Sequence, residues 1–115
     1  NDFTICMKDI EYKLSKNNMT ISGKRNLVLN WIGFGLEGKN IVIRGDVGRY
    51  LGYDAENCNI KVDGGAGEGV AHNAKNCKIE ITATGYIYPE GKIGFSIGKG
   101  TEVYFGGRRI WPKND

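Results

Sequence analysis

The chain repeats a pattern of residues every 19 positions along its centre. The segment Ile41-Val42-Ile43-Arg44-Gly45 recurs one period later as Ile60-Lys61-Val62-Asp63-Gly64, and Ile79-Glu80-Ile81 begins the pattern again. The end of the unit recurs too, as Ala55, Asn57 and Cys58 and then as Ala74, Asn76 and Cys77. A run of this length is improbable as coincidence, so it predicts one structural unit copied along an axis.

Each unit has the hydrophobic pattern of a β-strand. Apolar and polar residues alternate, as in Ile60-Lys61-Val62, which is the two-residue period of a strand with one buried face. A unit of this size is too short for a strand, a helix and two turns, whereas it suits two short extended segments joined by glycine turns. The sequence therefore predicts an all-β, single-stranded parallel β-helix of about five coils, each of about 19–22 residues, with terminal caps.

Charged residues agree with this stacking. If residue i lies over residue i+19, opposite charges should stack, because like charges at strand spacing repel. Four opposite pairs meet this condition: Arg44 over Asp63, Arg49 over Glu68, Glu56 over Lys75, and Lys61 over Glu80.

The length of 115 residues predicts one domain, 1–115. Within it, we expect residues 1–18 to form an N-terminal coil or cap, 19–107 the coils, and 108–115 a C-terminal cap or tail. The ends of a coil stack are open sheet edges that need covering. Trp111 is large enough to close a core, and Pro112 cannot extend a hydrogen-bond ladder.

The composition argues against several classes of partner. The net charge is +3 and the charges are interspersed, which indicates neither nucleic-acid nor membrane-surface binding. No apolar stretch has the length of a membrane span, and we recognise no signal peptide. Three cysteines without a CxxC spacing (Cys6, Cys58 and Cys77) argue against a disulfide framework or a closed zinc site, and they indicate a reducing cytoplasm.

The glycines carry a resemblance to a known family. Gly45, Gly48 and Gly52 form a G-xx-G-xxx-G element, and Gly64 and Gly67 begin a second copy in which Ala71 replaces the last glycine. This element resembles the GXGXG repeat of the C-terminal domain of the glutamate synthase large subunit, and is similar to the C subunit of formylmethanofuran dehydrogenase. The agreement is best over residues 19–85 and weaker to 107.

That resemblance implies a right-handed β-helix with a structural role. It implies no catalytic residue and no cofactor, because the family's domain packs against catalytic domains and spaces them. The implied partners are subunits of an oxidoreductase or amidotransferase assembly, or a second copy of this chain.

His72 is the only histidine and the weak candidate for catalysis. It falls in register with Phe34 and Tyr53, which predicts an aromatic ladder. The alternative is an acid or base that works with Asp54 or Asp63 in a small hydrolase, esterase-like or sugar-active. The chain has no G-x-S-x-G motif, and no serine or cysteine nucleophile lies in register with His72.

Two stacked cysteines are the weak candidates for binding a metal. Cys58 and Cys77 are predicted to be small buried residues, and the alternative is a pair of soft ligands in a metal- or ligand-binding module. Parallel side chains suit the dihedral angle of a disulfide poorly. The neighbouring Asn57 and Asn76 are expected to hydrogen-bond to one another. The glycines of residues 64–69 are interpreted as turn residues rather than a phosphate-binding loop, since no Walker or Rossmann context follows.

A group of aromatic and arginine residues is the predicted interaction surface. Such residues are enriched at protein interfaces, although a face for stacking carbohydrate is an alternative. The interface candidates are Trp31, Phe34, Arg44, Arg49, Tyr50 and Tyr53. The sequence thus predicts a non-catalytic scaffold or subunit-docking protein.

Overall fold

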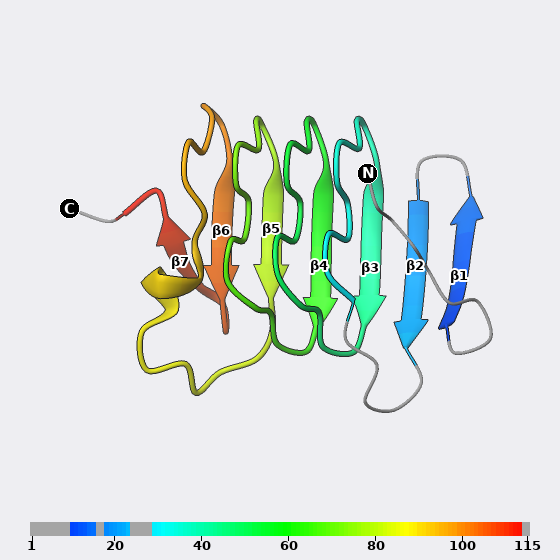
Figure 1. The fold of residues 1–115 in the computed structure, drawn as a ribbon, viewed down its shortest axis with the longest axis horizontal. Helices are drawn as coiled ribbons and strands as arrows, with labels where there is room; N and C mark the ends of the chain where they lie inside the picture. The colour runs from blue at the N-terminus through cyan, green and yellow to red at the C-terminus, as the bar shows by residue number, and fades with distance from the viewer. Residues whose placement is uncertain (1–9, 16–17, 24–28, 114–115) are drawn as a thin grey trace.

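One β-sheet organises the molecule. A computed structural model describes the backbone of residues 10–15, 18–23 and 29–113, and the side chains of residues 29–113. Seven strands form a single sheet in chain order (Figure 1). They are β1 (Ile10–Ser15), β2 (Asn18–Gly23), β3 (Asn40–Arg44), β4 (Asn59–Asp63), β5 (Lys78–Ile81), β6 (Glu102–Phe105) and β7 (Arg108–Trp111). A short 3-10 helix, η2 (Pro89–Lys92), precedes β6.

The central strands are parallel and in the predicted register. Ile41 pairs with Ile60, and Ile60 pairs with Ile79, so the predicted offset is confirmed from β3 to β5. The offset is larger between β2 and β3, where Asn18 pairs with Asn40. It is larger again between β5 and β6, where Lys78 pairs with Glu102.

The predicted β-helix of about five parallel coils is wrong. The described residues form one mixed sheet, in which β1 pairs with β2 and β6 pairs with β7 in antiparallel fashion. Hairpins therefore flank the parallel strands at both ends. The equal spacing that predicted coils holds only between β3 and β5. Alternating apolar and polar residues mark a strand but carry no information about its direction, which is why the pattern did not reveal the hairpins.

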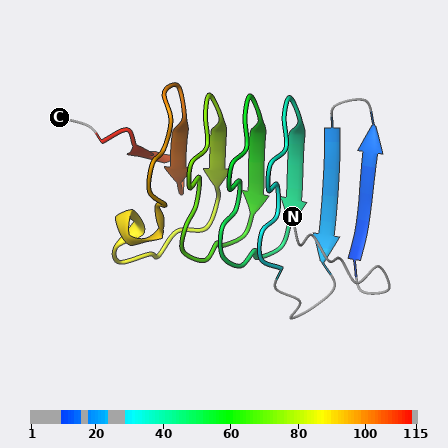
Figure 2. The same ribbon diagram turned by 45° about the horizontal axis from the view of Figure 1, so that its top comes forward.

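The core lies between the sheet and the segments that return the chain to the start of the next strand. We call residues 29–39, 45–58, 64–77 and 82–101 the returning segments. These returning segments run along one face of the sheet, giving two layers (Figures 1 and 2). In β3, β4 and β5 every second residue is buried, as the alternation predicts. The inward strand residues pack against buried residues of the returning segments, namely Ile32, Val47, Leu51, Ala55, Cys58, Ala66, Val70, Ala71, Ala74 and Cys77.

The returning segments are also hydrogen-bonded to one another. Glu37, Glu56 and Lys75 form successive parallel bridges, and Val70 bridges Ile93. Backbone groups of the turns continue these bonds, as where Ala71 N–H donates to Leu51 C=O at 2.8 Å. Corresponding residues of successive units therefore lie in columns parallel to the row of strands, and this arrangement gathers like residues on one surface.

Both ends of the sheet differ from the repeat. Residues 82–92 form a wide loop that leaves the row beside β6 (Figure 1). Residues 108–111, which were predicted to lie in a cap or tail, form strand β7, and Trp111 packs half-buried against the core. In the predicted cap of residues 1–18, only β1 and Asn18 are described; residues 1–9, with Cys6, and 16–17 lie outside the described part.

Candidate functional site

Six rings form one aromatic cluster on the returning segments. We define the aromatic cluster as Trp31, Phe34, Tyr50, Tyr53, His72 and Phe95. Tyr53 stacks between Phe34 and His72, with centroid distances of 5.3 and 4.7 Å and interplanar angles of 13° in both contacts. Trp31 stacks on Tyr50 at 4.4 Å, and Phe95 meets His72 edge-on at 6.1 Å. The predicted ladder of Phe34, Tyr53 and His72 is confirmed.

Backbone conformation places two of these rings. Trp31 and Tyr50 occupy equivalent positions and both have a left-handed backbone, with φ of 66° and 64°. A bulky residue in this region costs on the order of 1–2 kcal/mol, so packing of the rings must hold it there. Gly69 takes the same position in the next unit, with φ of 83°, and a Cβ on it would lie 2.5 Å from Tyr50 Cδ1. The column of rings therefore stops at Gly69 because the Tyr50 ring occupies the space above it.

The interior rings of the cluster have covered faces. Both faces of Tyr53 are in contact with other rings, and the cluster residues apart from Phe95 are half-buried. The exposed part of such a stack consists mainly of ring edges, which carry the positive side of the aromatic quadrupole. Stacking of a sugar ring needs a free aromatic face, which the interior ring of Tyr53 does not offer. Phe95, at 77% exposure, is the most accessible ring of the cluster.

The weak catalytic candidates do not form a catalytic pair. His72 Nδ1 accepts a hydrogen bond from the Phe95 backbone N–H at 3.0 Å, which holds the imidazole in the stack. The Asp54 carboxylate accepts a hydrogen bond from Asn73 Nδ2. Each side chain thus has a structural partner of its own, and the two residues are joined through the backbone, where the Asp54 N–H donates to the His72 carbonyl at 3.0 Å.

The two arginine candidates lie apart from one another. Arg49 precedes Tyr50 beside the aromatic cluster and pairs with Glu68, with 3.3 Å between Nε and Oε1. This ion pair is the one of the four predicted charge pairs that forms, and both its side chains are largely exposed. Arg44 lies at the end of β3, opposite Asp63 in register. The structure therefore adds Arg49 to the aromatic cluster and leaves Arg44 on the outer face of the sheet.

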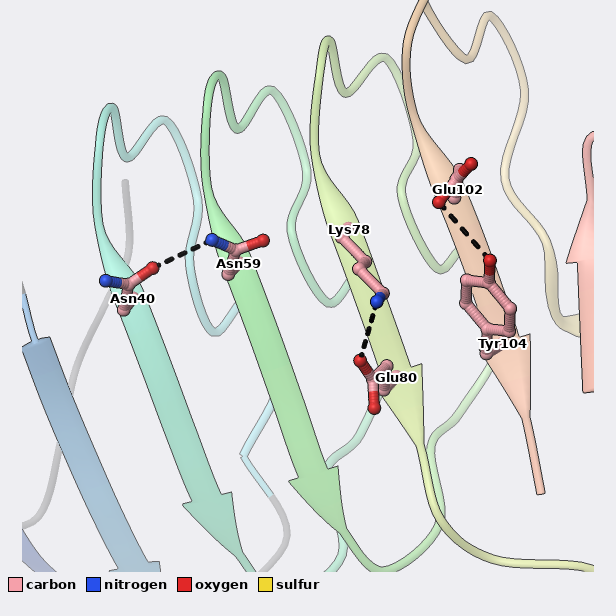
Figure 3. A network of polar contacts seen from close by, with 6 residues as sticks. All are labelled: Asn40, Asn59, Lys78, Glu80, Glu102 and Tyr104. Atoms are coloured by element: carbon pink, nitrogen blue, oxygen red, sulfur yellow. Dashed lines mark hydrogen bonds and ion pairs between the residues drawn. The ribbon is translucent and has the colours of Figure 1, made fainter. Parts of the chain in front are cut away.

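That outer face carries a network of polar contacts (Figure 3). Asn59 Nδ2 donates to Asn40 Oδ1 at 2.9 Å, and Lys78 Nζ lies 3.4 Å from Glu80 Oε1. Tyr104 Oη donates to Glu102 Oε1 at 3.3 Å, and Lys78 also lies over the Tyr104 ring. The ion pair on this face thus lies within one strand, where Glu80 pairs with Lys78 rather than with the predicted Lys61.

The glycine-rich loop is a place of close backbone contact. A Cβ on Gly64 would lie 2.5 Å from the Gly45 carbonyl oxygen, so only glycine fits there. The N–H of Gly65 donates to Asp46 Oδ1, that of Ala66 to Tyr86 Oη, and that of Gly67 to the carbonyls of Val47 and Gly48. These donors are used within the protein, which supports the structural interpretation over a phosphate-binding loop.

Cys58 and Cys77 are both free, buried and stacked in register, as predicted. A hydrogen bond from Cys77 lowers the pKa of the Cys58 thiol to about 6, against the opposing effect of burial, and nearby backbone groups of Lys39, Glu56 and Gly38 lower it further. The pKa of Cys77 is raised, first by the same hydrogen bond and then by burial. The two thiols therefore titrate as one pair that loses a first proton easily and holds the second.

Asn57 and Asn76 form the expected ladder. Asn76 Nδ2 donates to Asn57 Oδ1 at 2.6 Å. Both residues have a left-handed backbone, which asparagine tolerates better than most residues. The role of this pair is therefore to stabilise the turn before each strand.

Two residues of the site were missed at the sequence level. Phe95 completes the aromatic cluster, and the match of Ile93-Gly94-Phe95 with Leu51-Gly52-Tyr53 carried the signal for it. Tyr86 gave no signal, because it lies outside the repeat. Its hydroxyl bonds both backbone groups of Ala66, accepting from N–H at 2.6 Å and donating to C=O at 3.1 Å. Tyr86 thereby replaces a missing backbone neighbour at the end of the repeat.

The residues that the structure describes contain neither a cluster of metal ligands nor a membrane-spanning helix. No group of three or more His, Cys, Asp or Glu side chains suited to a metal ion occurs among them. Nor does any helix in this part of the chain have the length and apolar character needed to cross a membrane. Comparison with protein-family models, with curated proteins and with solved structures finds no match to this chain.

Proposed function

We propose that this protein is a non-catalytic docking module that binds a partner protein through the aromatic cluster. The observation that supports this most is the gathering of six rings on one surface, with Phe95 exposed at its end. Aromatic residues beside an arginine are enriched in protein interfaces relative to other exposed surfaces. Arg49 supplies the arginine here.

The chemistry of the partner follows from the stacked rings. Exposed ring edges are electropositive and suit backbone carbonyl oxygens and carboxylates, whereas exposed ring faces would suit sugars or cations. The partner is therefore a protein surface with acceptor groups around an apolar centre. The glycine resemblance suggests a subunit of an oxidoreductase or amidotransferase assembly, or a second copy of this chain, as that partner. The two buried free thiols fit the cytoplasm as the compartment.

The structure offers little to the competing catalytic function. Activation of a nucleophile or water needs a base within hydrogen-bond reach of the group that it deprotonates. His72 instead accepts from a backbone N–H and stacks on Tyr53. The hydrolase alternative predicts an activity that His72→Ala abolishes, and equal rates in both proteins would remove His72 from consideration.

Quantitative affinity purification from the source cells tests the docking proposal. The bait proteins are the wild type, Phe95→Ser and a control, Ile87→Ser, whose parent residue is 82% exposed and outside the aromatic cluster. We expect one set of subunits to co-purify with the wild type and the control, and to be depleted at least about tenfold with Phe95→Ser, because interface aromatics commonly contribute about 1.4 kcal/mol or more.

The mass of the purified protein distinguishes the two kinds of partner. Light scattering after size exclusion gives a dimer or larger assembly if the partner is a second copy. Docking through the aromatic cluster would be refuted if the purified protein is a monomer and the same proteins co-purify equally with all three baits.

A further inference from the structure

The two buried thiols occupy equivalent places in successive units. Cys58 directly precedes β4 and Cys77 directly precedes β5. The backbone N–H of Lys78 donates to the Cys58 carbonyl at 2.9 Å, which joins the two units beside the thiols. The column ends at Thr101, whose Oγ1 accepts from the Cys77 N–H at 3.2 Å. The column thus holds two sulfur atoms followed by a hydroxyl.

The two side chains point in the same direction. Cys58 Sγ lies 3.3 Å from the carbonyl oxygen of Glu56, two residues before it. Cys77 Sγ makes the same contact with the carbonyl of Lys75, at 3.2 Å. This shared contact points both Cβ–Sγ bonds in a similar direction, although Cys58 Sγ also lies 3.4 Å from the Leu36 carbonyl oxygen. The sulfurs are therefore offset along the row of strands by at most about the strand spacing, roughly 4.8 Å.

This arrangement is unsuited to the two common uses of paired cysteines. A disulfide needs a Cβ–S–S–Cβ dihedral of about 85–100°, whereas parallel bonds give a value near zero. A structural zinc or iron–sulfur site needs four ligands. The part of the chain described by the structure supplies no third cysteine, histidine or carboxylate beside the pair.

Two-coordinate ligation fits the geometry. A metal midway between two thiolates in a straight line spans twice the metal–sulfur bond, which is at most roughly 4.6 Å if the bond is no longer than the roughly 2.3 Å of zinc thiolates, and so lies within the strand spacing. In such a site the Cβ–S bonds of the two cysteines stand roughly at right angles to the sulfur–metal–sulfur line, as the bonds of Cys58 and Cys77 do here. We propose that Cys58 and Cys77 form a linear two-sulfur site for a soft monovalent cation of the Cu(I) type, since soft thiolate ligands select such ions.

Binding exchanges two protons for one cation. Both S–H bonds break, two metal–sulfur bonds form, and both protons go to solvent, so no oxidant or reductant is involved. Both thiols are only 1% exposed, but the adjoining Asn57 and Asn76 lie at the surface, so opening of one turn gives access.

Native mass spectrometry under anaerobic conditions tests the site, with Cu(I) in acetonitrile as the probe. The proteins are the wild type, Cys58→Ser, Cys77→Ser and the control Cys6→Ser. We expect the wild type and Cys6→Ser each to bind one Cu(I). The affinity should fall more than about a hundredfold in Cys58→Ser and Cys77→Ser, because each substitution removes one of only two ligands. Circular dichroism verifies that each variant folds.

X-ray absorption on the wild type adds a measurement that requires no variant. Two sulfur neighbours with no nitrogen or oxygen at the copper would support the linear site. Three or more neighbours, undiminished binding by Cys58→Ser or Cys77→Ser, or loss of binding in Cys6→Ser would each overturn it. None of these outcomes bears on docking through the aromatic cluster.

Discussion

Replacing Tyr86 by phenylalanine removes one hydroxyl from the point where the repeat ends. That hydroxyl accepts from the Ala66 N–H and donates to the Ala66 C=O. The ring itself has other contacts, edge-on to Phe105 at 5.1 Å and below the Lys92 ammonium at 5.1 Å. The substitution keeps these contacts, so it isolates the two hydrogen bonds.

The expected loss follows from what remains unbonded. Ala66 is 6% exposed, and a buried backbone group left without a partner costs about 1–3 kcal/mol. A surface groove of about 620 Å³, lined by both Ala66 and Tyr86, can admit water to part of this space. We therefore expect the free energy of unfolding to fall by about 1–2.5 kcal/mol, and the melting temperature by roughly 3–10 °C for a domain of this size.

Urea unfolding of Tyr86→Phe beside Tyr88→Phe measures this difference. Tyr88 has the same side chain at 79% exposure, so its variant should stay within about 0.5 kcal/mol of the wild type. Hydrogen exchange of the Ala66 amide should accelerate in Tyr86→Phe alone. Equal stability of the two variants, with an unchanged Ala66 exchange rate, would refute the structural role given to the hydroxyl.

Three further predictions concern the repeat. Gly69→Ala should lose about 1–3 kcal/mol in thermal unfolding, from left-handed strain and contact with the ring above it, while Gly91→Ala, in open space, should not. Ile79→Val should cost about 0.5–1.5 kcal/mol in urea, since Ile79 is fully buried, and Ile87→Val at 82% exposure should cost almost nothing; similar values would contradict the assigned core. In metal-free protein, the lowered pKa of Cys58 means that the unfolded chain binds more protons than the folded one between pH about 6 and 9. The free energy of unfolding should therefore rise with pH across that window, and this slope should vanish in Cys58→Ala.

The sequence predicted what repeats and missed what ends the repeat. Ile41, Ile60 and Ile79 pair as expected because a two-residue alternation copied at a constant interval determines both the buried face and the register. The antiparallel hairpins at each end obey the same alternation, so their direction could not be deduced from it.

The candidate site was predictable to a similar degree. His72 was placed in the aromatic stack because its column neighbours are Phe34 and Tyr53. Charge pairing was less informative, since Glu80 pairs with Lys78 on its own strand although Lys61 lies opposite it on the preceding strand. Exposed side chains choose among neighbours at similar distances, and the order of residues does not decide between them.

The register between β3 and β5 also makes the length of this protein adjustable. Strand β4 pairs with β3 and with β5 at the same offset, so residues 59–77 make up one complete interval of the repeat. Deletion of 59–77 would join Cys58 to Lys78 and bring Ile79 opposite Ile41, where Ile60 now lies. A gene encoding such units can therefore gain or lose one by unequal recombination, and each event changes the sheet by one strand without disturbing the hairpins at its ends.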